Sequence, residues 1–173
     1  PTVEGMAKEG HPYTGFLYAG LMIDENNNPK VIEYNCRFGD PETQPIMMRM
    51  QSDLVDLCLA AVDGELAGKE AKFDPRPAVG VVLAAGGYPG SYHKGHIITG
   101  IPEATESSKT FHAGTKEWDG DLKTAGGRVL CATALGETVT QAQKLAYEAV
   151  HAIKWEGVQF RTDIAYRAIA REQ

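Results

Sequence analysis

The pattern of apolar and polar positions in the first 40 residues predicts the end of a helix followed by a β-hairpin. Residues 2–8 have the composition of the last turns of a helix, because Gly10 and Pro12 follow them and oppose its continuation. Residues 14–23 are apolar on both faces, which is typical of a central strand covered on both sides. The turn-forming run Asp-Glu-Asn-Asn-Asn-Pro follows, so a second strand at 30–36 is expected to pair antiparallel with the first.

A longer amphipathic helix is predicted after this hairpin. Thr43 has the chemistry of an N-cap, and Pro45 suits the first turn. Apolar residues then recur at steps of three and four, as on one face of a helix. They are Met47, Met50, Leu54, Leu57, Cys58 and Ala61.

The second half of the chain has a different pattern, with short apolar runs separated by glycine-rich turns. The runs at 78–85, 109–115 and 127–135 predict a small curled, barrel-like β-sheet. A capping box at Thr138 and Gln141 begins a closing helix whose apolar face extends to Ile153. Glycines and prolines interrupt the pattern between these halves, so we expect domains at 1–67 and 68–173 and an α+β fold.

Composition narrows the class of protein. With 43% hydrophobic and 23% charged residues, the 173-residue chain has the balance of a folded, water-soluble protein. A net charge of −6 without a dense basic run argues against nucleic acid as a partner. The apolar runs are far shorter than the roughly 20 residues of a membrane helix. We therefore expect neither nucleic acid nor a membrane among the partners.

The cysteines and the first residues of the chain bear on the expected cellular location and on whether the chain is part of a longer protein. Cys36, Cys58 and Cys131 lie far apart without zinc-type spacing, so we expect reduced thiols. No secretory signal is recognisable, which makes the cytoplasm the expected location. The chain begins at Pro1 inside an apparent helix, and we expect it to be part of a longer protein.

The clearest candidate for chemistry is a pair of oxygen-bearing side chains on the second strand. Glu33 and Asn35 are two residues apart, so strand geometry places both on one face. A carboxylate and an amide oxygen suit Mg²⁺, which fills the rest of its shell with water and substrate phosphates. The alternative is that both are solvent-facing polar residues at the end of a strand.

The next loop adds three charged residues: Arg37, Asp40 and Glu42. The planar guanidinium of Arg37 matches a phosphate or carboxylate with two parallel hydrogen bonds. The alternative is internal pairing of Arg37 with Asp40 or Glu42. An exposed pair of that kind contributes only about 0 to 1 kcal/mol, so stability alone would hardly require such a loop.

The stretch at 31–44, Val-Ile-Glu-Tyr-Asn-Cys-Arg-Phe-Gly-Asp-Pro-Glu-Thr-Gln, resembles the signature of the glycinamide ribonucleotide synthetase (phosphoribosylamine-glycine ligase) family in the ATP-grasp superfamily. The Arg-Phe-Gly-Asp-Pro-Glu string is specific to this family, whereas Glu-x-Asn on a strand is shared by ATP-grasp enzymes. The resemblance extends over the whole chain and is closest to bacterial members. Further similar stretches are 13–21, 85–90, 111–115 and 126–130.

The resemblance implies the carboxy-terminal lobe of an ATP-grasp domain followed by a small β-rich domain. It implies an ATP-dependent ligase of purine biosynthesis that joins glycine to 5-phosphoribosylamine through a glycyl phosphate. The remaining amino-terminal domains would supply most of the ATP site, so the fragment alone is expected to be inactive. Substrates would be ATP, glycine and phosphoribosylamine, and no separate cofactor-binding residues are predicted.

The same resemblance assigns roles to single residues. Glu33 and Asn35 match the family's Mg²⁺ or Mn²⁺ ligands. Arg37 is expected to stabilise the acyl phosphate or a substrate anion, and Asp40 and Glu42 are expected to position the amine or order the loop. Many relatives carry a further acidic metal ligand on the preceding strand, where this chain has Ala19-Gly-Leu21. This difference implies a metal site with fewer protein ligands.

Two alternatives in function remain open at this point. One is another ATP-grasp amine or carboxylate ligase, and the other is a non-catalytic binding module. The loop Gly86-Gly-Tyr-Pro-Gly90 lacks the spacing of known phosphate-binding motifs and is interpreted as a structural turn.

Overall fold

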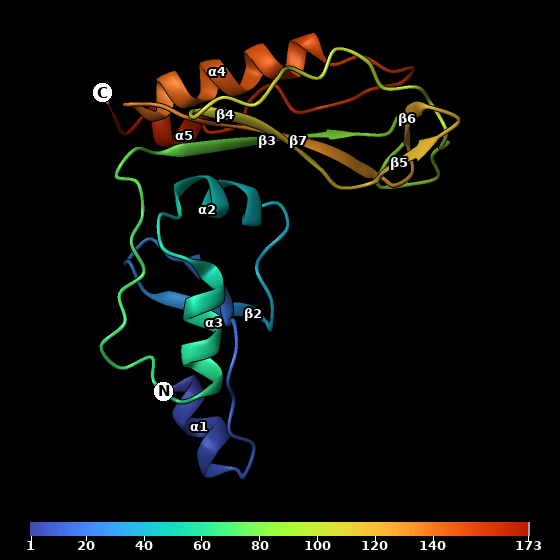
Figure 1. The fold of residues 1–173 in the computed structure, drawn as a ribbon. Helices are drawn as coiled ribbons and strands as arrows, with labels where there is room; N and C mark the ends of the chain where they lie inside the picture. Colours follow the sequence, from blue (N-terminus) through green and yellow to red (C-terminus); the bar gives the residue numbers. More distant parts are fainter. Residues whose placement is uncertain (173) are drawn as a thin grey trace. The chain divides into compact units, whose positions relative to one another are not determined.

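A computed structural model describes residues 1–172 and shows two compact units (Figure 1). The first unit contains residues 1–40 and 50–73, and the second contains residues 41–49 and the chain from 74 onward. All paired strands are antiparallel, so the predicted mixed fold with antiparallel sheets is confirmed. The domain division at 67/68 stays a prediction. No helix of the described chain is both long and apolar enough to cross a membrane.

The first unit is built on the predicted hairpin. Its elements are α1 (Thr2–Lys8), β1 (Tyr18–Ile23), β2 (Pro29–Asn35) and α3 (Leu54–Val62). One carboxylate oxygen of Asp24 accepts hydrogen bonds from the backbone N–H groups of Asn26 and Asn28, at 2.9 Å each. These bonds lower the pKa of Asp24, chiefly through Asn28. The turn is therefore closed by its own side chain, as the run of Asp and Asn residues predicts.

The prediction that the first strand is covered on both sides is wrong for this unit. Among the described residues, β1 and β2 form a two-stranded sheet without a third strand. Met22 and Ile23 are more than half exposed, and Ile32 is 64% exposed. An apolar strand is expected to be buried, but its burial depends on other elements that pack against it, and the composition of the strand does not specify these.

The single helix predicted from Thr43 onward is also wrong, because the chain forms two helices. The first, α2 (Thr43–Arg49), ends where Met50 forms a bridge with Phe73. The second, α3, begins after Asp53, whose side chain accepts the backbone N–H groups of Val55 and Asp56. An N-cap and an extended pairing therefore interrupt a helical spacing that continues on both sides of the break.

The second unit contains a three-stranded sheet in the order β3-β7-β4 and a separate β5-β6 hairpin. The helices of this unit are α2, α4 and α5. The bounds are β3 (Ala78–Ala84), β4 (Ser108–His112), β5 (Thr115–Trp118), β6 (Asp121–Thr124), β7 (Arg128–Leu135), α4 (Val139–Ala152) and α5 (Tyr166–Ile169). The described strands do not close into a barrel.

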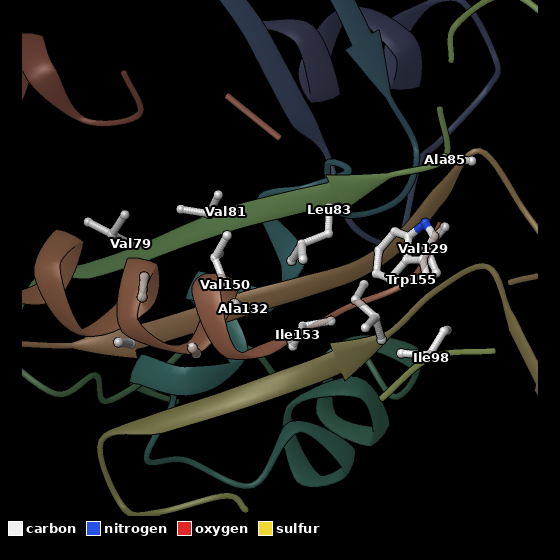
Figure 2. Packing of buried hydrophobic residues seen from close by; sticks show 14 of the residues in the cluster. Val79, Val81, Leu83, Ala85, Ile98, Val129, Ala132, Val150, Ile153 and Trp155 are labelled. Atoms are coloured by element: carbon white, nitrogen blue, oxygen red, sulfur yellow. The ribbon is translucent and has the colours of Figure 1, made fainter. Parts of the chain in front are cut away.

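The core of this unit lies between the sheet and α4 (Figure 2). Alternate β3 residues Val79, Val81 and Leu83 are buried in this cluster, as the two-residue period of a strand requires. On the opposite face, a Cβ added to Gly80 would lie 3.1 Å from Cγ of Pro45 in α2. The sheet is therefore covered by α4 on one face and partly by α2 on the other (Figure 1).

Two sets of contacts cap the start of α4. As predicted, the Thr138 side chain accepts the backbone N–H of Gln141 at 3.1 Å, while the Gln141 side chain accepts that of Glu137. The carboxylate of Glu172 accepts the backbone N–H groups of Val139 and Thr140. These bonds lower the pKa of Glu172, with the bond from Val139 as the largest cause.

Replacing Glu172 with glutamine is expected to destabilise the second unit slightly at neutral pH. Because the pKa of Glu172 is lowered in the folded state, its stabilising effect is present above the ordinary pKa and is lost as the pH falls through the lowered value. Thermal unfolding of the parent and E172Q should therefore differ at pH 7 and converge in acid. A difference that grows on acidification would contradict this role, and the control is Glu148→Gln in α4, the helix that Glu172 caps.

Candidate functional site

The structure brings Glu33 and Asn35 together on one face of β2. The amide nitrogen of Asn35 donates a hydrogen bond to Oε1 of Glu33 at 3.1 Å. Glu33 is exposed and Asn35 is half-buried, so both remain accessible to a ligand. The intervening Tyr34 lies on the other face, where its hydroxyl is 2.8 Å from Oγ1 of Thr2 in α1.

Glycine stands opposite the carboxylate on the neighbouring strand. Gly20 pairs with Glu33, and the register of the two strands shifts between Gly20 and Leu21. A Cβ added to Gly20 would lie 3.1 Å from Cγ of Glu33, closer than most such contacts allow. Gly20 therefore leaves room for the Glu33 side chain.

The residues present fit a divalent ion that is shared with a phosphate group. Half a turn of the Asn35 amide would exchange its nitrogen for its oxygen, so that two oxygens face the same point. Residues 1–172 contain no group of three His, Cys, Asp or Glu side chains that could hold a metal alone. Mg²⁺ and Mn²⁺ suit such an oxygen pair, because both accept water and phosphate oxygens as further ligands.

The signature loop begins directly after this pair. Arg37 is exposed, and its Nη1 donates to the backbone carbonyl of Phe38 at 2.9 Å. The Phe38 ring packs on Phe16 with ring centroids 4.2 Å apart, which anchors the loop in the first unit. Gly39 is buried and Asp40 is exposed. The predicted residues Glu33, Asn35, Arg37 and Asp40 all lie in the first unit.

Glu42 lies beyond the division between the units. The chain enters the second unit at Pro41, and Glu42 is exposed just before α2. Of the predicted site residues, Glu42 is therefore the one that belongs to the second unit.

Sequence reasoning missed a cavity of about 660 Å³ that lies within the second unit. Two arginines, Arg128 and Arg161, line it together with Tyr88 and with Pro41 of the signature loop. Arg128 stands in one of the stretches that carried the family resemblance, but its type alone pointed to no role. Its position could be recognised only when β7, the 86–90 turn and the segment after α4 were seen to meet.

Comparisons with known proteins give a consistent result over the whole chain. The family description "Phosphoribosylglycinamide synthetase, C domain" matches residues 78–167, and "Phosphoribosylglycinamide synthetase, ATP-grasp (A) domain" matches residues 1–43. The chain is 67% identical over 174 residues to a phosphoribosylamine--glycine ligase of Vibrio parahaemolyticus, covering 100% of this chain and 41% of that protein. It is 65% identical over 175 residues to the protein of the same name in Salmonella typhimurium, with the same coverage.

A solved structure shows the same similarity in three dimensions. The phosphoribosylamine--glycine ligase of Thermotoga maritima matches with a TM-score of 0.79 and 42% sequence identity. The match covers 92% of this chain and 39% of that one. The present chain therefore spans about two fifths of the length of the relatives it matches.

Proposed function

The chain belongs to the phosphoribosylglycinamide synthetase family, and from that premise we propose that it forms part of an ATP-dependent ligase that joins glycine to 5-phosphoribosylamine. The reaction would release ADP and phosphate in purine biosynthesis. The observation that carries this proposal for the site is the Glu33–Asn35 pair, held side by side directly before the signature loop.

The proposed reaction proceeds in two steps. The carboxylate of glycine takes the γ-phosphoryl group of ATP and becomes an acyl phosphate. The amine of phosphoribosylamine then attacks the acyl carbon, and phosphate leaves. Activation of this kind replaces a poor leaving group by a good one, so the amide bond can form at neutral pH.

Glu33 and Asn35 would hold Mg²⁺ or Mn²⁺. The ion, when bound, neutralises charge on the ATP phosphates as the γ-phosphoryl group moves. The Asn35 amide donates to the Glu33 carboxylate, which holds the two side chains next to each other, and Asp24 closes the turn of the same hairpin. Preorganisation of this kind lowers the reorganisation needed during the reaction.

Arg37, Asp40 and Glu42 would bind the substrates. We assign Arg37 and Asp40 to the catalytic machinery, with Arg37 stabilising the acyl phosphate or a substrate anion through charged hydrogen bonds. Asp40 and Glu42 would position the amine of phosphoribosylamine. All three are accessible, since each has an exposed side chain in the structure.

The rest of the ATP site is proposed to lie in the part of the relatives that this chain does not cover. The chain by itself would then be inactive, and its partners would be these further domains and the three small substrates. The net charge of −6 argues against nucleic acid as a further partner, and we propose the cytoplasm as the location.

ADP release by the full-length ligase that carries this chain tests the proposed function. We expect ADP to form only when glycine, phosphoribosylamine and Mg²⁺ or Mn²⁺ are all present, at a rate typical of enzymes, about 1 to 1,000 s⁻¹. Turnover with another amine acceptor would indicate a different ligase of the superfamily. No ADP release with any acceptor would indicate a binding module and contradict the proposal.

A further inference from the structure

The segment before β1 contains three residues to which the proposed reaction gives no role. Tyr13, Gly15 and Phe16 stand at 13–16, within a stretch that carried the family resemblance. They supply no carboxylate, ammonium or guanidinium group that could take part in phosphoryl or acyl transfer. Phe16 is 38% exposed, yet its ring contacts the signature loop. The contacts of this segment therefore bear on how the loop is held.

Tyr13 fixes the backbone at Phe16. The Tyr13 hydroxyl donates a hydrogen bond to the backbone carbonyl of Phe16. Gly15, between them, has a φ of +147°, which residues with a side chain rarely adopt. A Cβ added to Gly15 would lie 3.2 Å from the Tyr13 hydroxyl oxygen, closer than most such contacts allow. The turn at 13–16 therefore depends on glycine, and it determines where the Phe16 ring is placed.

The Phe16 ring packs on the ring of Phe38 in the signature loop. The two ring centroids are 4.2 Å apart, and the ring planes are tilted by 38°. Phe16 precedes β1 and Phe38 follows β2, so the contact lies at the open end of the hairpin, beyond the pairing of Tyr18 with Asn35. Aromatic pairs contribute more than the apolar area that they cover, because the rings prefer particular relative orientations. The contact therefore holds the loop at a defined place beside the hairpin.

Phe38 in turn holds Arg37. The backbone carbonyl of Phe38 accepts a hydrogen bond from Nη1 of Arg37 at 2.9 Å. Arg37 is exposed, and a long side chain without a fixed partner samples many rotamers. The position of the carbonyl that restrains it depends on the packing of the Phe38 ring on Phe16. A continuous series of contacts thus leads from Tyr13 to the guanidinium of Arg37.

Order at Arg37 matters for the reaction proposed above. Charged hydrogen bonds from a guanidinium to a phosphate or carboxylate depend on direction as well as distance. A donor that is oriented before the substrate binds loses less conformational entropy on binding, and a small misplacement of such a group lowers the rate.

We propose that Phe16 is a positioning residue of the ligase: its ring holds Phe38, and the carbonyl of Phe38 orients the Arg37 guanidinium. Tyr13 and Gly15 support Phe16 by fixing the turn at 13–16. This inference rests on the proposed function, because the role of Arg37 comes from there. The contacts that carry it all lie within the first unit.

Phe16→Ala in the full-length ligase is the first test. F16A is expected to lower kcat/KM for ADP release about threefold to tenfold, the loss expected from one aromatic pair. Phe16→Tyr keeps the ring and should stay within twofold of the parent. Leu17→Ala is the matched control, because Leu17 is apolar and 39% exposed but has no aromatic ring. If F16Y or L17A is as slow as F16A, the ring contact is not the cause and the proposal is wrong.

A double variant distinguishes positioning of Arg37 from a general effect on the fold. If Phe16 acts through Arg37, F16A should cause no further loss in a ligase that already carries Arg37→Met. The rate of F16A/R37M should then lie within twofold of that of R37M. Losses that multiply in the double variant would overturn the proposal, because Phe16 would then act independently of Arg37.

Cleavage by trypsin after Arg37 provides a readout that requires no turnover. Digestion without substrates reports how often the loop opens, because the protease cuts the open form. This cut, identified by fragment mass, should be about threefold to tenfold faster in F16A than in the parent. Tyr13→Phe loses only the hydroxyl that donates to Phe16, so the cut should be about twofold faster.

Y13F keeps the test valid if F16A fails to fold. Equal rates of cleavage in the parent and both variants, or no cut after Arg37 in any of them, would overturn the proposal. If the cut accelerates in F16A but the parent releases no ADP with any amine acceptor, the proposed function fails and the restraint of the loop by Phe16 stands.

Discussion

Replacing Glu33 with alanine in the full-length ligase is expected to lower kcat by about a hundredfold or more. In the proposed site the carboxylate is one of two side-chain oxygen ligands on β2, and alanine would leave Asn35 as the sole ligand of the pair. Initial rates of ADP release at saturating glycine and phosphoribosylamine measure the loss. Raising Mg²⁺ or Mn²⁺ should restore part of the rate, because the variant binds the ion more weakly.

The control for this variant is Glu25→Ala, which removes an exposed acid from the turn of the same hairpin. Its activity should equal that of the parent, and chelation of the divalent ion should abolish activity in both. If E33A keeps a rate within threefold of the parent, Glu33 is not a metal ligand. Far-ultraviolet circular dichroism should show that both variants keep the parental secondary structure.

The largest effect on stability is expected from Leu130→Ala. Leu130 is completely buried in β7, the central strand of the three-stranded sheet. Removing a buried leucine side chain costs about 2 to 5 kcal/mol, because it loses apolar burial and leaves a cavity. Urea unfolding of the parent and L130A measures this difference in the free energy of unfolding.

An apolar residue of the same unit provides the comparison. Ile97 is 50% exposed, so Ile97→Ala should change the free energy of unfolding by less than about 1 kcal/mol. Equal losses in the two variants would contradict the assignment of the core to the space between the sheet and α4. Trp155, which is 7% exposed in the core cluster, offers a fluorescence signal for the transition.

Several elements were predictable because their signals lie within a few residues. The hairpin depends on a turn that Asp24 closes with its own side chain. The start of α4 depends on Thr138 and Gln141, three residues apart. The shared face of Glu33 and Asn35 follows from the period of a strand. Each of these features is decided by local hydrogen bonds or by backbone geometry.

Other elements depend on residues that are distant in sequence. Met50 leaves the helical path because it pairs with Phe73, and Glu172 caps a helix that begins more than 30 residues earlier. The apolar spacing through Met50 is the same whether the helix continues or breaks. Periodicity alone therefore could not distinguish one helix from two.

The candidate site and the cavity differ in the same way, because one lies in a continuous segment and the other is formed by residues distant in sequence. The sequence alone indicated the type of chemistry that we propose, because the signature loop and the Glu33–Asn35 pair form one continuous segment. Only the tertiary structure decided that Arg128, Tyr88 and Arg161 surround one cavity. These positions are 33 to 73 residues apart in the sequence, and they come together only when the packing of β3, β7 and the segment after α4 outweighs the entropy of closing the loops between them.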